Sequence, residues 1–111
     1  MKQMSMQKAF CEMGSAFDVS IKMRVKFFSH VQKHIDEWND VKRELLVRCE
    51  RGDSRICGMG FIDEVRRERK AAGGREFVVN NNWSPYYCRL FALLYPEYRD
   101  RFEFRKLKEA A

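Results

Sequence analysis

The sequence predicts a mainly α-helical protein in which three shorter helices pack on one long amphipathic helix, with a short two-stranded β element near the C-terminus. Three observations lead to this fold class. Apolar residues recur at helical spacing across residues 20–51, glycines follow two of the expected helices, and two short segments after residue 75 have strand-like patterns. With 111 residues, 45% of them hydrophobic, the chain is long enough for a single domain, residues 1–111, with its own core.

Residues 20–51 are expected to form the long helix. Apolar side chains recur every three or four residues from Ile21 to Cys49, which places them on one stripe of the helix. Ser20 is a favourable N-cap, and Gly52 readily adopts the left-handed conformation that ends helices. About thirty residues at 1.5 Å each give a helix roughly 45 Å long.

A shorter helix is expected before it, over residues 1–17. Met6, Phe10, Met13 and Phe17 recur at four-three-four spacing, which is the pattern of an amphipathic helix of about three turns. The first residues of this helix have no obvious cap in the sequence. Methionine adapts to irregular surfaces, so this helix can pack on the long helix or serve as a contact surface.

The remaining residues, 61–107, are expected to form a basic unit of helix, strand, helix and strand. In the first helix, residues 61–72, the apolar residues Phe61, Ile62 and Val65 face inward, and two glycines end it. The second helix, residues 84–95, begins with a serine-proline pair and carries only one charged residue. It must therefore be covered nearly all round.

The two expected strands pair with each other in this prediction. Residues 76–79 are short and β-branched, which is typical of a strand. Phe102 and Phe104 alternate with charged residues, as in a half-buried strand. The order of elements from residue 61 also fits a helix-turn-helix with a wing. However, the helix over residues 84–95 offers few polar side chains for reading base edges.

The long helix also has the sevenfold repeat of a coiled-coil seam. Lys42 falls at the centre of that seam, a position where a lysine fixes register in parallel two-stranded coiled coils. We therefore expect a homodimer through residues 21–49. The competing interpretation is that the stripe is closed within one chain and Lys42 reaches water past the shorter elements. The seam residues expected at the dimer interface are Phe28, Val31, Ile35, Trp38, Lys42 and Leu45.

Motifs of catalysis and cofactor binding are missing from the sequence. There is no nucleophile elbow and no phosphate-binding glycine loop, so we expect a protein that is not an enzyme and uses no cofactor. His30 and His34 have the four-residue spacing of metal ligands. No further ligand is spaced to complete a site, and we expect no metal.

The composition also predicts a compartment. No apolar run is long enough to span a bilayer, and the first residues lack the apolar core of a signal peptide. Four widely spaced cysteines without a CxxC pair then indicate reduced thiols. We expect a cytoplasmic protein, of a cell or an infected host, without a membrane partner.

The distribution of charge favours a polyanionic partner. The net charge is +6, and residues 51–111 carry 13 basic and 9 acidic groups against 9 and 7 in residues 1–50. Arginine outnumbers lysine by 13 to 9, and eight of the fifteen aromatic residues lie between Trp83 and Phe104. Arginines bind phosphates and aromatic rings stack on unpaired bases, so this mixture is typical of nucleic-acid binding.

We therefore expect a small non-enzymatic nucleic-acid-binding protein of regulatory or accessory type. Asn81 and Trp83 are expected closest to the bases. The expected phosphate contacts are Arg66, Arg67, Arg69, Lys70, Arg75, Arg99, Arg101 and Arg105.

The alternative function is a protein-interaction module, such as a small inhibitor or adaptor that docks on a larger complex. The methionine-rich first helix and the tyrosine-rich C-terminal block are both typical of contact surfaces.

Overall fold

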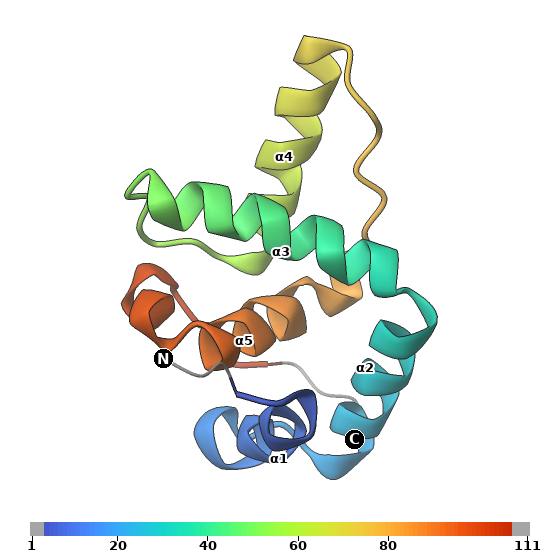
Figure 1. Ribbon diagram of the computed structural model, residues 1–111, viewed down its shortest axis with the longest axis vertical. Coiled ribbons are helices and arrows are strands. Elements are labelled where there is room, and N and C mark those ends of the chain that lie inside the picture. The colour runs from blue at the N-terminus through green and yellow to red at the C-terminus, as the bar shows by residue number, and fades with distance from the viewer. Residues whose placement is uncertain (1–3, 108–111) are drawn as a thin grey trace.

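The computed structural model describes residues 4–107, with the side chain of Asn81 outside the described part. Helix α5 lies in the middle, α1 and α2 cover one side of it, α3 crosses its other side, and α4 projects from the body (Figure 1). The expectation of a mainly helical protein is confirmed. The helices are α1 (Met6–Phe17), α2 (Ile21–Lys33), α3 (Ile35–Glu50), α4 (Gly58–Ala72) and α5 (Ser84–Leu94), with the short 3-10 helices η1 (Asn81–Trp83) and η2 (Pro96–Arg101).

The predicted two-stranded β element is wrong, because residues 4–107 contain no strand. Residues 74–80 run alongside α4 as an extended segment (Figure 1). Side-chain donors replace a partner strand there: the Arg66 guanidinium donates to the backbone carbonyls of Phe77 (3.3 Å) and Val79 (2.7 Å). Phe102 forms an isolated parallel bridge with Ile56 instead of pairing with residues 76–79.

The predicted continuous helix over residues 20–51 is also wrong, because it bends at its middle. His34 leaves the helical region, with φ −129° and ψ 50°, so α2 ends at Lys33 and α3 begins at Ile35. The Ser20 cap is confirmed, since its hydroxyl accepts a hydrogen bond from the backbone N–H of Met23 at 3.2 Å. The bend turns α3 across α5 (Figure 1). The buried residues of α3 are Trp38, Val41, Leu45, Arg48 and Cys49.

This bend changes the seam predicted for the homodimer. Ile35 is 49% exposed, and the Lys42 ammonium lies at the edge of the core, 6.0 Å from the centroid of a Trp38 ring. The other seam residues belong to the chain's own core: Val31, Trp38 and Leu45 are buried and Phe28 packs against them. The stripe is thus closed within one chain, as in the competing interpretation, and the homodimer stays a prediction.

Helix α1 has an N-cap that the sequence analysis missed. The Ser5 hydroxyl accepts a hydrogen bond from the backbone N–H of Lys8 at 3.2 Å, and the helix begins at the next residue. Asp18 ends α1 with a left-handed φ of 55° and does not cap the following helix. Met13 is buried, whereas Met6 is 36% exposed, so this helix packs on the core along one side only.

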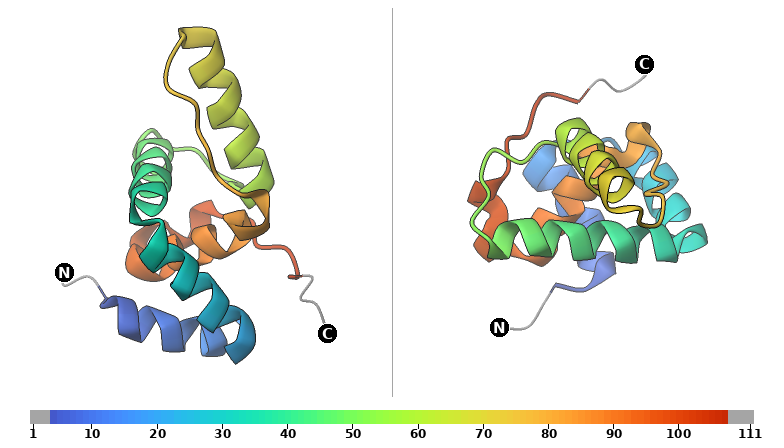
Figure 2. Two further views of the ribbon diagram at one scale, coloured as in Figure 1. Left: turned by 90° about the vertical axis from the view of Figure 1, so that its right-hand side faces the viewer. Right: turned by 90° about the horizontal axis from the view of Figure 1, so that it is seen from above.

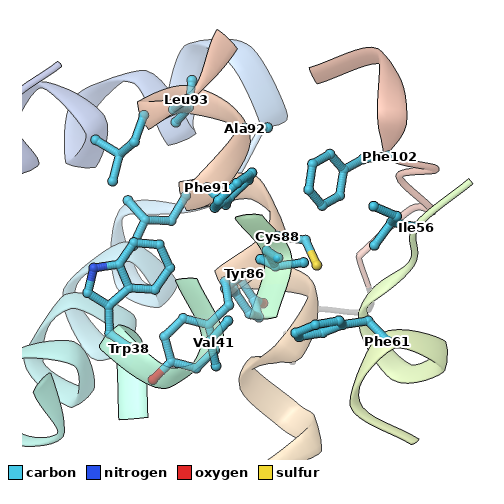
Figure 3. Close-up of a cluster of buried hydrophobic side chains, with 14 of the residues drawn as sticks. Trp38, Val41, Ile56, Phe61, Tyr86, Cys88, Phe91, Ala92, Leu93 and Phe102 are labelled. Carbon is cyan, nitrogen blue, oxygen red and sulfur yellow. The ribbon is translucent and has the colours of Figure 1, made fainter. Parts of the chain in front are cut away.

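Helix α5 is the element around which the other helices pack. All of its residues except Pro85 are buried, which confirms the prediction that it is covered all round. Figure 3 shows Trp38 and Val41 of α3, Phe61 of α4 and Phe102 arranged around it. A helix that is buried on every side has no face for a DNA groove, so α5 is not a recognition helix. Within residues 4–107, no helix combines the length and the apolar character needed to cross a membrane.

One charged side chain of α5 lies within this core. Arg89 is 5% exposed, and its guanidinium lies over the rings of Phe17 and Phe104, 5.7 and 5.1 Å from their centroids. It donates to the backbone carbonyls of Pro85 at 2.9 Å and Arg105 at 2.6 Å. Arg89 therefore fastens the segment after η2 to the central helix.

Replacing Leu90 with alanine tests the central position of α5. Leu90 is completely buried, so the substitution leaves a cavity and is expected to lower the free energy of unfolding by about 3 kcal/mol. Val78→Ala is the control, because Val78 is 70% exposed and its loss is expected to cost less than about 0.5 kcal/mol. Urea unfolding followed by circular dichroism measures both. Equal costs for the two variants would contradict the central role of α5.

Candidate nucleic-acid interface

Helix α4 and the return segment, residues 74–80, form a projection that we call the finger (Figure 1). Phe61, Ile62 and Val65 anchor its base in the core, which confirms the predicted inward face of this helix. Gly73 ends α4 with a φ of 68°, the left-handed conformation in which glycine is favoured, and the chain then turns back toward the body. The outer half of the finger extends beyond the rest of the molecule (Figure 2).

The return segment is held against α4 by side chains rather than by a sheet. Phe77 is buried, with its ring edge-on to that of Phe61 at a centroid distance of 6.0 Å. The Arg69 guanidinium lies 4.7 Å from the centroid of the Phe77 ring, and Arg66 donates to two carbonyls of the segment. Two of the predicted phosphate contacts, Arg66 and Arg69, therefore stabilise the finger from within.

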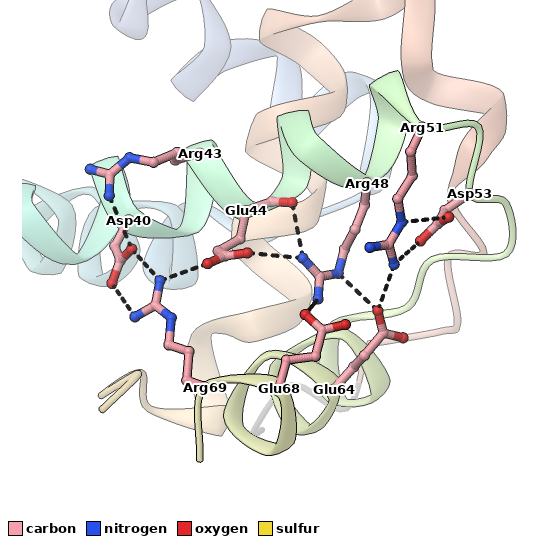
Figure 4. A network of polar contacts seen from close by, with 9 residues as sticks. All are labelled: Asp40, Arg43, Glu44, Arg48, Arg51, Asp53, Glu64, Glu68 and Arg69. Carbon is pink, nitrogen blue, oxygen red and sulfur yellow. Dashed lines mark hydrogen bonds and ion pairs between the residues drawn. The ribbon is translucent and has the colours of Figure 1, made fainter. Parts of the chain in front are cut away.

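A network of ion pairs joins the finger to α3 (Figure 4). At its centre is Arg48, which is only 2% exposed. Its guanidinium contacts the carboxylates of Glu44 at 2.9 Å, Glu64 at 3.1 Å and Glu68 at 2.6 Å. The burial of Arg48 was not predicted from the sequence. Its burial depends on α4, whose two glutamates supply compensating charge.

The same network continues toward the tip of the finger through Arg69. Its guanidinium contacts Asp40 at 2.7 Å and Glu44 at 2.7 Å, and both carboxylates are mostly buried. The hydrogen bond from Arg69 holds the pKa of Asp40 below its ordinary value. Arg75 of the return segment adds a longer contact with Asp40, at 3.3 Å.

The surface of the finger carries exposed basic groups. Arg67 and Lys70 are exposed on α4, and the Arg75 side chain is 73% exposed although it also contacts Asp40. Glu64 and Glu68 pair with Arg48, although their side chains are 40% and 49% exposed. The exposed carboxylates Asp63 and Glu76 reduce this basic charge only in part.

The remaining predicted arginines are not brought to the finger. Arg99 and Arg101 lie on η2, on the opposite side of the molecule from the return segment (Figures 1 and 2). The Arg99 guanidinium lies 4.7 Å from the centroid of the Phe17 ring. Arg101 is half-buried, and Arg105 has a long contact of 3.8 Å with Glu103. The eight predicted phosphate contacts thus do not form one surface.

Of the two residues expected closest to the bases, Trp83 has a packing role. Its ring stacks on His30 with a centroid distance of 5.3 Å and lies 5.7 Å from the Phe27 ring, so it is half-buried between α2 and α5. The backbone of Asn81 belongs to η1, but its side chain lies outside the part that the structure describes. The contact of Trp83 and Asn81 with bases stays a prediction.

The two histidines at the bend contact other side chains of the protein. His30 contacts the Glu37 carboxylate at 3.0 Å and lies next to the His34 ring, with a centroid distance of 4.4 Å. The Tyr87 hydroxyl donates to the same carboxylate at 2.8 Å, and burial raises the pKa of that hydroxyl. Across the described residues 4–107, no cluster of three potential metal ligands occurs.

An open cavity of about 560 Å³ lies where the segment before α4 meets α3. Its lining includes Arg67 and Cys57 but also the acidic side chains of Asp53 and Glu64, so it presents no single sign of charge. Two other cysteines are buried: burial raises the pKa of Cys49 to about 11 and that of Cys88 to about 12. These two thiols therefore stay protonated and unreactive at neutral pH.

The exposed charge of α2 was missed by the sequence analysis, which assigned the basic surface to the C-terminal half. Lys22, Lys26 and Lys33 are all exposed on this helix. The signal was present in the sequence, since no acidic residue occurs between Asp18 and Asp36. The prediction considered only the uneven charge of the two halves of the chain, and the basic excess is larger in residues 51–111.

Comparison of the chain with protein-family models, with curated proteins and with solved structures gives no match.

Replacing Arg48 with methionine tests the ion-pair network. The variant leaves Glu68 without its cation and removes one of the two cations of Glu44 and of Glu64, and we expect the free energy of unfolding to fall by about 2–4 kcal/mol. Arg51→Met is the matched control. Arg51 also contacts Glu64, at 3.0 Å, but its side chain is 46% exposed, so its loss is expected to cost less than about 1 kcal/mol. Urea unfolding compares the two, and a cost no larger for Arg48 would contradict its central role.

The pair between Asp40 and Arg69 predicts a dependence of stability on pH. The pKa of Asp40 is lower in the folded protein than the ordinary value of 3.8, so its ionised form favours folding. This contribution is present above pH 3.8 and is lost as the pH falls through the lower folded pKa. Unfolding in urea should therefore show a smaller decline in stability below pH 3.8 for Asp40→Asn than for the wild type. An identical decline would show that Arg69 does not stabilise the carboxylate.

Proposed function

We propose that this protein binds nucleic acid without catalysing a reaction, and that the finger contacts the phosphate backbone. The observation that supports this function is the separation of charge on the finger. Glu64 and Glu68 pair with Arg48, whereas Arg67, Lys70 and Arg75 are exposed, although Arg75 also contacts Asp40 at 3.3 Å. Exposed basic side chains can replace the counterions of a polyanion.

The shape of the finger favours an extended polyanion over a small anionic ligand. Small ligands bind in concave sites with convergent polar groups, whereas the finger is a convex projection. Arg67 and Lys70 lie three residues apart, about 4.5 Å along the helix axis, and Arg75 lies beyond the turn. Such a row can contact successive phosphates along a strand.

This proposal uses three of the eight arginine and lysine residues predicted as phosphate contacts. Arg66 and Arg69 keep the finger rigid, which holds the outer charges in one geometry. The rigidity matters because contacts from preordered side chains cost less conformational entropy on binding.

The dependence of binding on salt tests the function. We expect a fluorescein-labelled 20-base-pair duplex to bind the wild type, with log K falling linearly with log salt. Replacing Arg67, Lys70 and Arg75 together with alanine should reduce the slope by about 2.7, since each lost phosphate contact contributes about 0.9. Fluorescence anisotropy at several salt concentrations measures the slope.

A matched control removes the same charge elsewhere. Lys8, Arg43 and Lys106 are exposed and lie outside the finger, so their triple replacement with alanine should leave the slope nearly unchanged. Equal effects of the two triple variants on the slope would show that binding depends only on the net charge of the protein. This result would contradict the role of the finger. Failure of the wild type to bind duplex DNA, single-stranded DNA or RNA at about 50 mM salt would remove the function itself.

A second candidate function, a protein-interaction module, is favoured by one surface. A groove of about 250 Å³ lies between α1 and α3, lined by Met6, Ile35, Trp38 and Lys42 among others. Met6 and Ile35 are exposed by 36% and 49%, and methionine-lined grooves adapt to protein partners. An affinity pull-down before and after nuclease treatment separates the candidates, because a partner that survives the nuclease favours this function.

A further inference from the structure

Helix α2 is an exposed basic helix that the function above does not use. Its thirteen residues include four arginine or lysine residues and no acidic residue. Arg24 turns inward, where it donates to the Phe10 carbonyl at 3.4 Å and lies over the Phe10 ring. The other three, Lys22, Lys26 and Lys33, remain exposed to solvent.

The exposed residues of α2 form two parallel rows. At about 100° per residue, Lys22, Lys26 and Lys33 fall on one row that extends about 16 Å along the axis. The neighbouring row contains Ile21, Val25 and Gln32. Ile21 and Val25 are 57% and 55% exposed, and Gln32 is exposed as well. A lysine row beside a row of aliphatic and amide side chains is the composition of a helix that contacts both phosphates and base edges.

The opposite face of α2 seats the helix firmly on the body. Phe27 and Val31 are buried, and the Phe27 ring lies 5.2 Å from the Tyr87 ring and 5.7 Å from the Tyr86 ring. Ser20 caps the first turn. The exposed rows are therefore presented by a rigid helix, and they need no reordering to meet a partner.

The finger and α2 lie on a common side of the molecule. In Figure 2, left, the return segment and α2 both face the viewer, one above the other. The longest dimension of the protein is 39 Å, and one turn of B-form DNA is about 34 Å. A duplex along this side would meet α2 and the finger within about one helical turn.

We propose that α2 enters the major groove of B-form duplex DNA, with its lysine row on the phosphates and its Ile21, Val25 and Gln32 row toward the bases. This inference rests on the nucleic-acid binding proposed above and identifies double-stranded DNA as the class of partner. Aliphatic side chains contact the thymine methyl group, and a glutamine amide pairs with adenine. The deep, narrow major groove of A-form RNA does not admit a helix, so duplex RNA is excluded from this mode.

The composition of α2 favours duplex DNA over an anionic membrane surface. Helices that lie in a membrane interface carry a broad apolar face with tryptophan, phenylalanine or leucine. The exposed face of α2 offers only Ile21 and Val25, and Gln32 follows them in the same row. The three lysines of α2 complement the charge of phosphates, and Gln32 supplies the polar group that base recognition needs.

The test compares a 20-base-pair DNA duplex with an RNA duplex of the same sequence. We expect the wild type to bind the DNA duplex at least about tenfold more tightly, because only its major groove admits α2. Replacing Lys22, Lys26 and Lys33 with alanine should abolish this preference. The finger variant, with Arg67, Lys70 and Arg75 replaced, should weaken binding to both duplexes by a similar factor. The Lys8, Arg43 and Lys106 variant is again the control.

A second measurement addresses base recognition. Gln32→Ala should change the sequences selected from a pool of random DNA duplexes while it leaves the salt slope unchanged, since glutamine carries no charge. Circular dichroism of each variant verifies that the fold is retained, as expected for exposed positions. An unchanged selection together with an unchanged DNA preference in the lysine variant would overturn the proposal.

The outcomes also separate this inference from the proposed function. Equal binding of DNA and RNA duplexes by the wild type would overturn the role of α2 and leave phosphate binding by the finger standing. No binding to any nucleic acid would overturn both. Binding to phosphatidylserine vesicles that depends on the three lysines of α2, with DNA binding unaffected by them, would assign α2 to a membrane surface and overturn the proposal.

Discussion

The burial of α5 on every side is the constraint on which the rest of the structure depends. Its residues from Tyr86 to Leu94 have no face for water, so every neighbouring helix must contribute apolar cover. The chain bends at His34, and α3 crosses α5 after this bend. Helix α1 and the segment after η2 also pack on the same core, the latter through Arg89.

A second interaction, centred on Arg48, determines which charges remain available. A buried guanidinium requires nearby carboxylates, and α4 supplies two of them from its inner side. Arg67 and Lys70 of α4 are left exposed and supply basic groups on the finger. The internal ion pairs of this protein are thus connected to its proposed function, because they set the sign of the exposed surface.

The two proposed contact elements differ in how they meet a nucleic acid. The finger projects from the body and carries dispersed charge, which suits the backbone. Helix α2 is seated on the core through Phe27 and Val31 and carries uncharged side chains beside its lysines. Positioning by phosphate contacts and selection by base contacts are separate tasks in duplex recognition, and separate elements would perform them here.

The amino-acid sequence by itself determined the helical class, the inward face of α4, the left-handed turn at Gly73 and the complete burial of α5. These features follow from local periodicity and from glycine, which act within a few residues. The tertiary structure alone decided the bend at His34 and the absence of a strand at residues 76–79. It also decided which arginines are buried in ion pairs and which are exposed. Whether an arginine is buried, as Arg48 is, or exposed, as Arg67 is, depends on which carboxylates and carbonyls the fold brings to it. Those partners lie far away in the sequence, so no local pattern predicts which of them will contact a given arginine.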